Sequence, residues 1–126
     1  MYTIELIPAG ICGVMPGLAL TDVLTLVFRR AVTGERHEAF RLFQRVLPQI
    51  VFSLQNIELF HRAEKLLLQA RGILWETNVR EAGLELNECN KAHLDFLNMG
   101  ILALLEEVAL PANPLKAVRV TSVSPG

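Results

Sequence analysis

The sequence predicts a mainly α-helical chain with one short buried strand, and two observations indicate this fold class. Apolar residues recur at three- and four-residue spacing over four long segments, which is the period of an amphipathic helix. The segment from Ile11 to Met15 is short and apolar, lies between Gly10 and Pro16, and is typical of a strand inside a parallel sheet. Because a strand needs hydrogen-bonding neighbours, we expect its partner strands upstream of the printed sequence.

The first two helices are predicted on either side of a glycine. The first is expected to begin behind Thr21 or Asp22, since either side chain can accept a hydrogen bond from the free N–H groups of a first turn. It should end before Gly34. The second is expected over residues 35–54, where Pro48 removes one backbone hydrogen bond and predicts a kink or a split into two helices.

Two further helices are predicted, separated by a connector. The third is expected from Ile57 to Arg71, with Gly72 beyond its end, and the fourth from a cap at Asn87 to about residue 107. Residues 75–86 have no clear period and indicate an extended link. Residues 108–126 contain several prolines and few large apolar residues, which predicts a disordered tail.

Composition limits the classes of partner. The 126 residues carry 12 basic and 13 acidic side chains and a net charge of −1, without a basic cluster, so neither nucleic acid nor an anionic membrane is expected as a partner. Cys12 and Cys89 form no CxxC pair, which excludes a zinc motif and predicts a reducing, cytoplasmic location. No basic residue precedes the apolar stretch at residues 11–29, so a signal peptide is not expected.

Four segments, taken in order, are similar to one enzyme family. ELIPAGICGVMPGLALTDVL resembles the eighth strand and eighth helix of the (β/α)8 barrels of the dihydrodipicolinate synthase and N-acetylneuraminate lyase family. TGERHEAFRLFQRVLPQI is similar to the family's next helical segment, with Glu35 at its acidic position and Leu47-Pro48 where Leu-Pro is common. EKLLLQARGIL has the family's lysine seven residues before a glycine, and NVREAGLELNECNKAHLDFL is similar to its final link and helix.

The resemblance covers residues 5–107 and implies that the chain is the carboxy-terminal portion of a TIM barrel enzyme. Residues 1–34 would be the end of the barrel, with the tail of helix 7, strand 8 and helix 8, and residues 35–107 the carboxy-terminal helical region. Members of the family are Schiff-base lyases, aldolases or dehydratases of pyruvate and related 2-keto acids, commonly tetrameric. The resemblance thus implies a homo-oligomer or dependence on an amino-terminal barrel portion, and no metal or other cofactor.

The resemblance also implies that this chain lacks the catalytic groups. The family's imine-forming lysine lies on the sixth strand and its proton-shuttling tyrosine on the fourth. Lys65 and Lys91 fall on polar helix faces, Lys116 falls in the tail, and the lone tyrosine, Tyr2, lies in the wrong part. No catalytic residue is therefore expected here.

One substrate-binding residue is implied, at the carboxyl end of the strand. Met15 would line the keto-acid pocket through its main chain, and Gly17 would leave room at the rim. The alternative is a core methionine and a turn glycine. Without the barrel, five apolar side chains would be exposed to water: Ile11, Val14, Leu24, Val27 and Phe28.

The remaining candidates give no second site. His37, His61 and His93 fall on different helices without a metal-ligand spacing, so no metal site is expected. Cys89 has no base near it in the sequence, so it is not expected to act as a nucleophile. Glu64 and Lys65, and the pair Glu106 and Glu107, are expected to be solvated charges. A non-enzymatic helical interaction module remains the alternative function.

Overall fold

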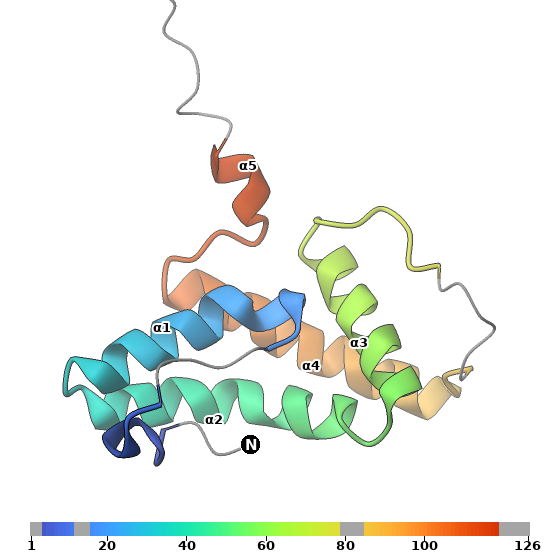
Figure 1. The fold of residues 1–126 in the computed structure, drawn as a ribbon. Coiled ribbons are helices and arrows are strands. Elements are labelled where there is room, and N and C mark those ends of the chain that lie inside the picture. The colour runs from blue at the N-terminus through green and yellow to red at the C-terminus, as the bar shows by residue number, and fades with distance from the viewer. Residues whose placement is uncertain (1–3, 12–15, 79–84, 119–126) are drawn as a thin grey trace, which may run out of the picture.

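The computed structural model describes residues 4–11, 16–78 and 85–118. This part of the chain has five α-helices, preceded by two short 3-10 helices, and no strands; α1 to α4 pack together as a bundle and α5 projects away from them (Figure 1). The mainly α prediction is confirmed to this extent. Of the predicted strand, residues 12–15 lie outside the described residues. In chain order the elements are η1 (Ile7–Ala9), η2 (Leu18–Leu20), α1 (Thr21–Val32), α2 (Arg36–Ser53), α3 (Ile57–Ala70), α4 (Glu88–Glu107) and α5 (Pro114–Val118).

Helices α1 and α2 form a hairpin at the centre of the bundle. Gly34 turns the chain between them with a φ of 89°, a conformation that favours glycine. Leu24 and Val27 of α1 are only 4% and 0% exposed, because they pack into one core with residues of α2 and α4. The expectation that these two side chains would face water is therefore wrong, since neighbouring helices of the same chain cover them.

Helix α2 continues through Pro48 without a break, so of the two predicted effects of this proline, a kink or a split into two helices, the split is wrong. The proline ring lies on the exposed side of the helix, whereas Val46, Gln49 and Ile50 beside it are buried. Tertiary packing therefore holds both sides of the proline in one helix. The backbone hydrogen bond that proline removes is lost at an exposed position, where water can replace it.

Helices α3 and α4 both begin at an asparagine cap. The side chain of Asn56 accepts a hydrogen bond of 2.8 Å from the Leu59 N–H, and that of Asn87 accepts one of 2.8 Å from the Asn90 N–H. The predicted cap at Asn87 is confirmed, while the cap at Asn56 was not foreseen. Figure 1 shows α4 passing behind the α1–α2 hairpin and α3 packing across one end of it. The large side chains buried most completely are Leu42, Leu67, Leu94, Ile101, Leu104, Leu105, Val23, Val27 and Val46.

The chain beyond α4 is partly helical. Within the segment expected to be disordered, Pro114–Val118 forms α5, and residues 119–126 lie outside the described residues. The side chain of Asn113 donates a hydrogen bond of 2.7 Å to the Gly72 carbonyl and so ties this segment to the end of α3. None of the described helices has both the length and the apolar character needed to cross a bilayer.

Candidate functional site

A cleft of about 400 Å³ opens between η2, the start of α1, the end of α2 and α3. Its volume falls within the range of about 300 to 1,000 Å³ that is usual for small-molecule sites. The walls are mostly apolar, and three polar side chains interrupt them: Gln49, Ser53 and Glu64. The full lining is Pro16, Gly17, Leu20, Leu24, Gln49, Ile50, Ser53, Leu54, Phe60, Ala63 and Glu64.

Glu64 projects from α3 to the start of the 3-10 helix η2. One oxygen of its carboxylate accepts a hydrogen bond of 3.0 Å from the Ala19 N–H. The carboxylate lies so close to Gly17 that a Cβ atom at this glycine would be 2.6 Å from its carbon and from both of its oxygens. Gly17 has an ordinary extended φ of −61°, so space for Glu64, rather than backbone conformation, favours glycine here.

The surroundings of Glu64 raise its pKa above the ordinary value of 4.5. Burial is the main cause, while the hydrogen bond from Ala19 and the charge of His61 act in the opposite direction. None of the side chains that line the cleft is cationic, and no ion pair to Glu64 occurs in the described part of the chain. The prediction that Glu64 is a solvated charge is therefore wrong. Its spacing from Phe60 and Leu67, which places it on the inner side of the helix, was the signal that could have revealed it.

Gln49 is the second polar group of the cleft, and it is only 4% exposed. Its Oε1 has no hydrogen-bond partner within the described residues. A buried acceptor that is left unpaired costs about 1 to 3 kcal/mol of stability. Protein atoms enclose this oxygen, so it is not open to the cleft. Ser53 lies one turn further along α2, and its hydroxyl donates a hydrogen bond of 3.0 Å to the Ile50 carbonyl.

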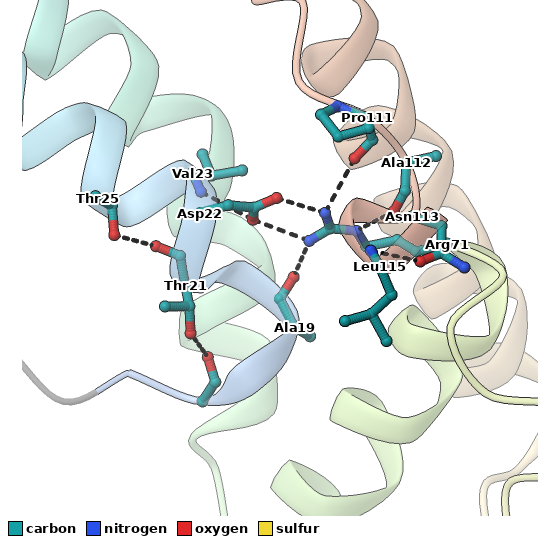
Figure 2. A network of polar contacts seen from close by, with 11 residues as sticks. Ala19, Thr21, Asp22, Val23, Thr25, Arg71, Pro111, Ala112, Asn113 and Leu115 are labelled. Carbon is teal, nitrogen blue, oxygen red and sulfur yellow. Dashed lines mark hydrogen bonds and ion pairs between the residues drawn. The ribbon is translucent and has the colours of Figure 1, made fainter. Parts of the chain in front are cut away.

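The buried Arg71 clamps one side of the cleft in place (Figure 2). Its guanidinium donates to both oxygens of Asp22, at 3.0 and 2.5 Å, and to the Ala19 carbonyl at 2.5 Å. It also donates to the carbonyls of Pro111 and Ala112, at 3.3 and 2.8 Å. These five bonds match the five N–H groups of arginine, and they join α3 to α1 and to the segment after α4. We interpret Arg71 as structural, since its side chain is 1% exposed and fully bonded.

The residues that the sequence singled out lie elsewhere or outside the described part. Met15 and Cys12 belong to residues 12–15, although Pro16 and Gly17, which follow directly, line the cleft. Lys65 donates a hydrogen bond to the Asn78 carbonyl and does not line the cleft. Lys91 and Lys116 are exposed.

The histidines and the exposed cysteine are not among the residues that line the cleft. His37, His61 and His93 are exposed and lie on α2, α3 and α4, the three separate helices that the sequence predicted. The His93 ring packs 4.9 Å from that of Phe52. Over the described ranges, no three side chains of the metal-ligating types gather in one place. Cys89 is exposed in the first turn of α4.

Comparison of the chain with protein-family models, with curated proteins and with solved structures gave no match.

Proposed function

We propose that the chain is the carboxy-terminal part of a class I lyase, an aldolase or dehydratase that acts on pyruvate or a related 2-keto acid through a Schiff base, and that it is inactive alone. The observation that carries this proposal is the order of its helices. The four segments similar to the dihydrodipicolinate synthase and N-acetylneuraminate lyase family overlap α1, α2, α3 and α4, one helix each and in chain order. In this proposal α1 is helix 8 of the barrel, and α2 to α4 are the helical region behind it.

Local features support the same alignment. The Leu47-Pro48 pair lies within one continuous helix, and Gly72, the glycine seven residues after Lys65, ends α3 with a φ of 71°. Pro16 and Gly17, which would follow strand 8, open directly into the cleft. In the barrel alignment, Gly72 is thus the residue that ends a helix, and Pro16 and Gly17 are the residues between strand 8 and helix 8.

The lysines support a non-catalytic role for this chain. An amine that forms an imine must be partly deprotonated, which requires a desolvated pocket. Lys91 and Lys116 are exposed, and the Lys65 amine is bonded to a backbone carbonyl outside the cleft. The reacting lysine would thus come from the barrel portion, and this portion or further copies of the chain would be its partners in a cytoplasmic enzyme that needs no metal.

Borohydride trapping tests this assignment. The purified chain is incubated with labelled pyruvate and borohydride, which reduces any imine to a stable amine, and the products are analysed by mass spectrometry. The proposal predicts no adduct on this chain. A stoichiometric adduct on any of the three lysines would contradict it, because the chain would then carry its own imine-forming amine.

A helical interaction module is the second candidate function, and the burial of the α1 stripe favours it. Because Leu24 and Val27 are covered by helices of the same chain, the bundle has a core without any barrel. At the same time several large apolar side chains are 58 to 70% exposed and could contact another protein: Leu18, Leu54, Ile57, Phe96 and Met99. The two candidates differ in one measurement. That measurement is the urea unfolding of this chain with and without an added family barrel that lacks its own carboxy-terminal part. An interaction module should unfold in a single transition whose midpoint the barrel does not change. The carboxy-terminal part of a lyase should bind the barrel, and its midpoint should rise.

A further inference from the structure

The cleft between η2, α2 and α3 presents one carboxylate that lacks a cationic partner. The Glu64 carboxylate has one recorded bond, from the Ala19 N–H, and no cationic side chain lines the cleft around it. The Gln49 Oε1 also has no partner within the described residues, but protein atoms enclose it, so a ligand in the cleft does not reach it. The Glu64 carboxylate therefore favours a ligand that brings N–H donors and positive charge.

We propose that this cleft binds a small organic amine, with its protonated nitrogen against Glu64 and an apolar body along the walls of the cleft. An ammonium group supplies three N–H donors and one positive charge, and a carboxylate accepts such donors in short, charge-assisted hydrogen bonds. The site goes beyond the proposed lyase function, because it uses neither an imine nor the residues before Pro16.

The walls of the cleft favour an amine that carries a hydrocarbon group. Leu20, Leu24, Ile50 and Ala63 provide an apolar surface for such a group. The ring of Phe60 lies in the same lining and can attract a cation through its face. An aromatic or branched alkyl amine fits well within about 400 Å³.

Other ligand classes fit less well. An anion would meet the Glu64 carboxylate with no cationic side chain in the lining to balance it. A divalent metal ion would find a single carboxylate, and the described residues contain no group of three His, Cys, Asp or Glu side chains for it. A neutral hydrocarbon would contact the walls but leave the Glu64 carboxylate with the Ala19 N–H as its one recorded donor.

Titration of the full chain with 2-phenylethylamine tests the proposal. Binding is followed by the amide nuclear magnetic resonance signals of Ala19, Leu20 and Ala63, with 3-phenylpropionate as an anion of similar shape. We expect saturable shifts with the amine below about 10 mM and at least about tenfold weaker binding of the anion. Equal binding of amine and anion, or no shift of these signals with the amine, would overturn the proposal.

Variants then locate the amine within the cleft. Glu64→Gln should weaken binding by at least about tenfold, because the neutral amide no longer attracts the positive charge of the amine. Glu58→Gln, at an exposed position on the same helix, is the matched control and should leave the affinity unchanged. If Glu64→Gln binds within about twofold of the unmodified chain, the assignment is wrong.

A variant at the mouth of the cleft keeps the test decisive if Glu64→Gln does not fold. Leu54 lines the cleft but is 58% exposed, so Leu54→Lys should leave the core intact. Its ammonium group would compete with the amine and repel it, and we expect a loss of affinity of at least about fivefold. Unchanged affinity in a folded Leu54→Lys variant would contradict binding in this cleft. The two proposals can fail separately. A pyruvate adduct on this chain would contradict the lyase assignment and leave the amine site untouched, whereas absence of amine binding would contradict the amine site alone.

Discussion

Glu64, in the middle of α3, and Arg71, directly after its last residue, bond the N–H and the carbonyl of the same residue, Ala19. The Glu64 carboxylate accepts the Ala19 N–H at 3.0 Å, and the Arg71 guanidinium donates to the Ala19 carbonyl at 2.5 Å. The short helix η2 is thereby fixed to α3 from both directions. Because η2 leads directly into α1, these two side chains position the entrance of α1 and one wall of the cleft.

Removal of the Arg71 clamp should strongly destabilise the fold. Arg71→Ala leaves Asp22 and three carbonyl groups without their donor, and breaking a buried ion pair in this way costs about 3 to 5 kcal/mol of unfolding free energy. The matched control is Arg30→Ala, which breaks an exposed ion pair with Glu35 and should cost less than about 1 kcal/mol. Urea unfolding measures both values, and equal losses for the two variants would contradict the clamp.

The close contact between Gly17 and Glu64 predicts that substitutions at these two positions are coupled. Gly17→Ala should displace the carboxylate and cost about 1 kcal/mol through the lost hydrogen bond to Ala19. In a Glu64→Ala background the same change should become neutral or stabilising by about 0.5 kcal/mol, since alanine restricts the unfolded chain. A double-mutant cycle measured by urea unfolding checks this, and purely additive effects would argue against the contact.

The raised pKa of Glu64 predicts a pH dependence of stability with a definite sign. The folded chain holds the proton of Glu64 more tightly than the unfolded chain, whose pKa is close to 4.5. The unfolding free energy contributed by Glu64 is therefore greatest at or below this value, and it falls as the pH rises through the folded pKa.

The Glu64→Gln variant isolates this contribution because all other titrating groups cancel in the difference. The unmodified chain should gain stability relative to the variant as the pH is lowered from about 7 to about 4. Urea unfolding at several pH values measures the difference. If the difference in unfolding free energy between the two chains stays constant with pH, or changes in the opposite direction, burial does not raise the pKa of Glu64.

Two arginines of α2 should lower the pKa of Glu107 at the end of α4. Its carboxylate accepts hydrogen bonds of 2.8 Å from Arg45 and 2.9 Å from Arg41, and these bonds hold the pKa below 4.5. In Arg45→Met, we expect the Glu107 pKa to rise toward its ordinary value. Arg36→Met, at an exposed position of the same helix, is the control and should leave it unchanged. Side-chain nuclear magnetic resonance follows the titration, and an identical Glu107 pKa in both variants would refute the link.

The sequence predicted the helices well because their signals are local. The boundary at Gly34 and the cap at Asn87 each depend on residues within one turn, and both are confirmed. The split at Pro48 was wrong because the packing of distant helices, which a local rule does not contain, holds α2 together.

The cleft was harder to predict because its polar contacts join residues far apart in the sequence. Arg71 takes its acceptors from α1 and from the segment after α4, and the main acceptors there are backbone carbonyls, which every residue has. The partner of Glu64 is also a backbone group, the Ala19 N–H. The sequence did direct attention to Pro16 and Gly17, which line the cleft, through the role it gave to the neighbouring Met15.

The most direct measurement of the central claim is the recovery of imine formation in a mixture. A lyase of the dihydrodipicolinate synthase and N-acetylneuraminate lyase family is truncated before its eighth strand, and this chain is added with labelled pyruvate and borohydride. An unrelated helical protein of similar size serves as the control. The proposal predicts a pyruvate adduct on the lysine of the truncated barrel only when this chain is present. No increase in adduct above the control, with the chain folded and in excess, would contradict it.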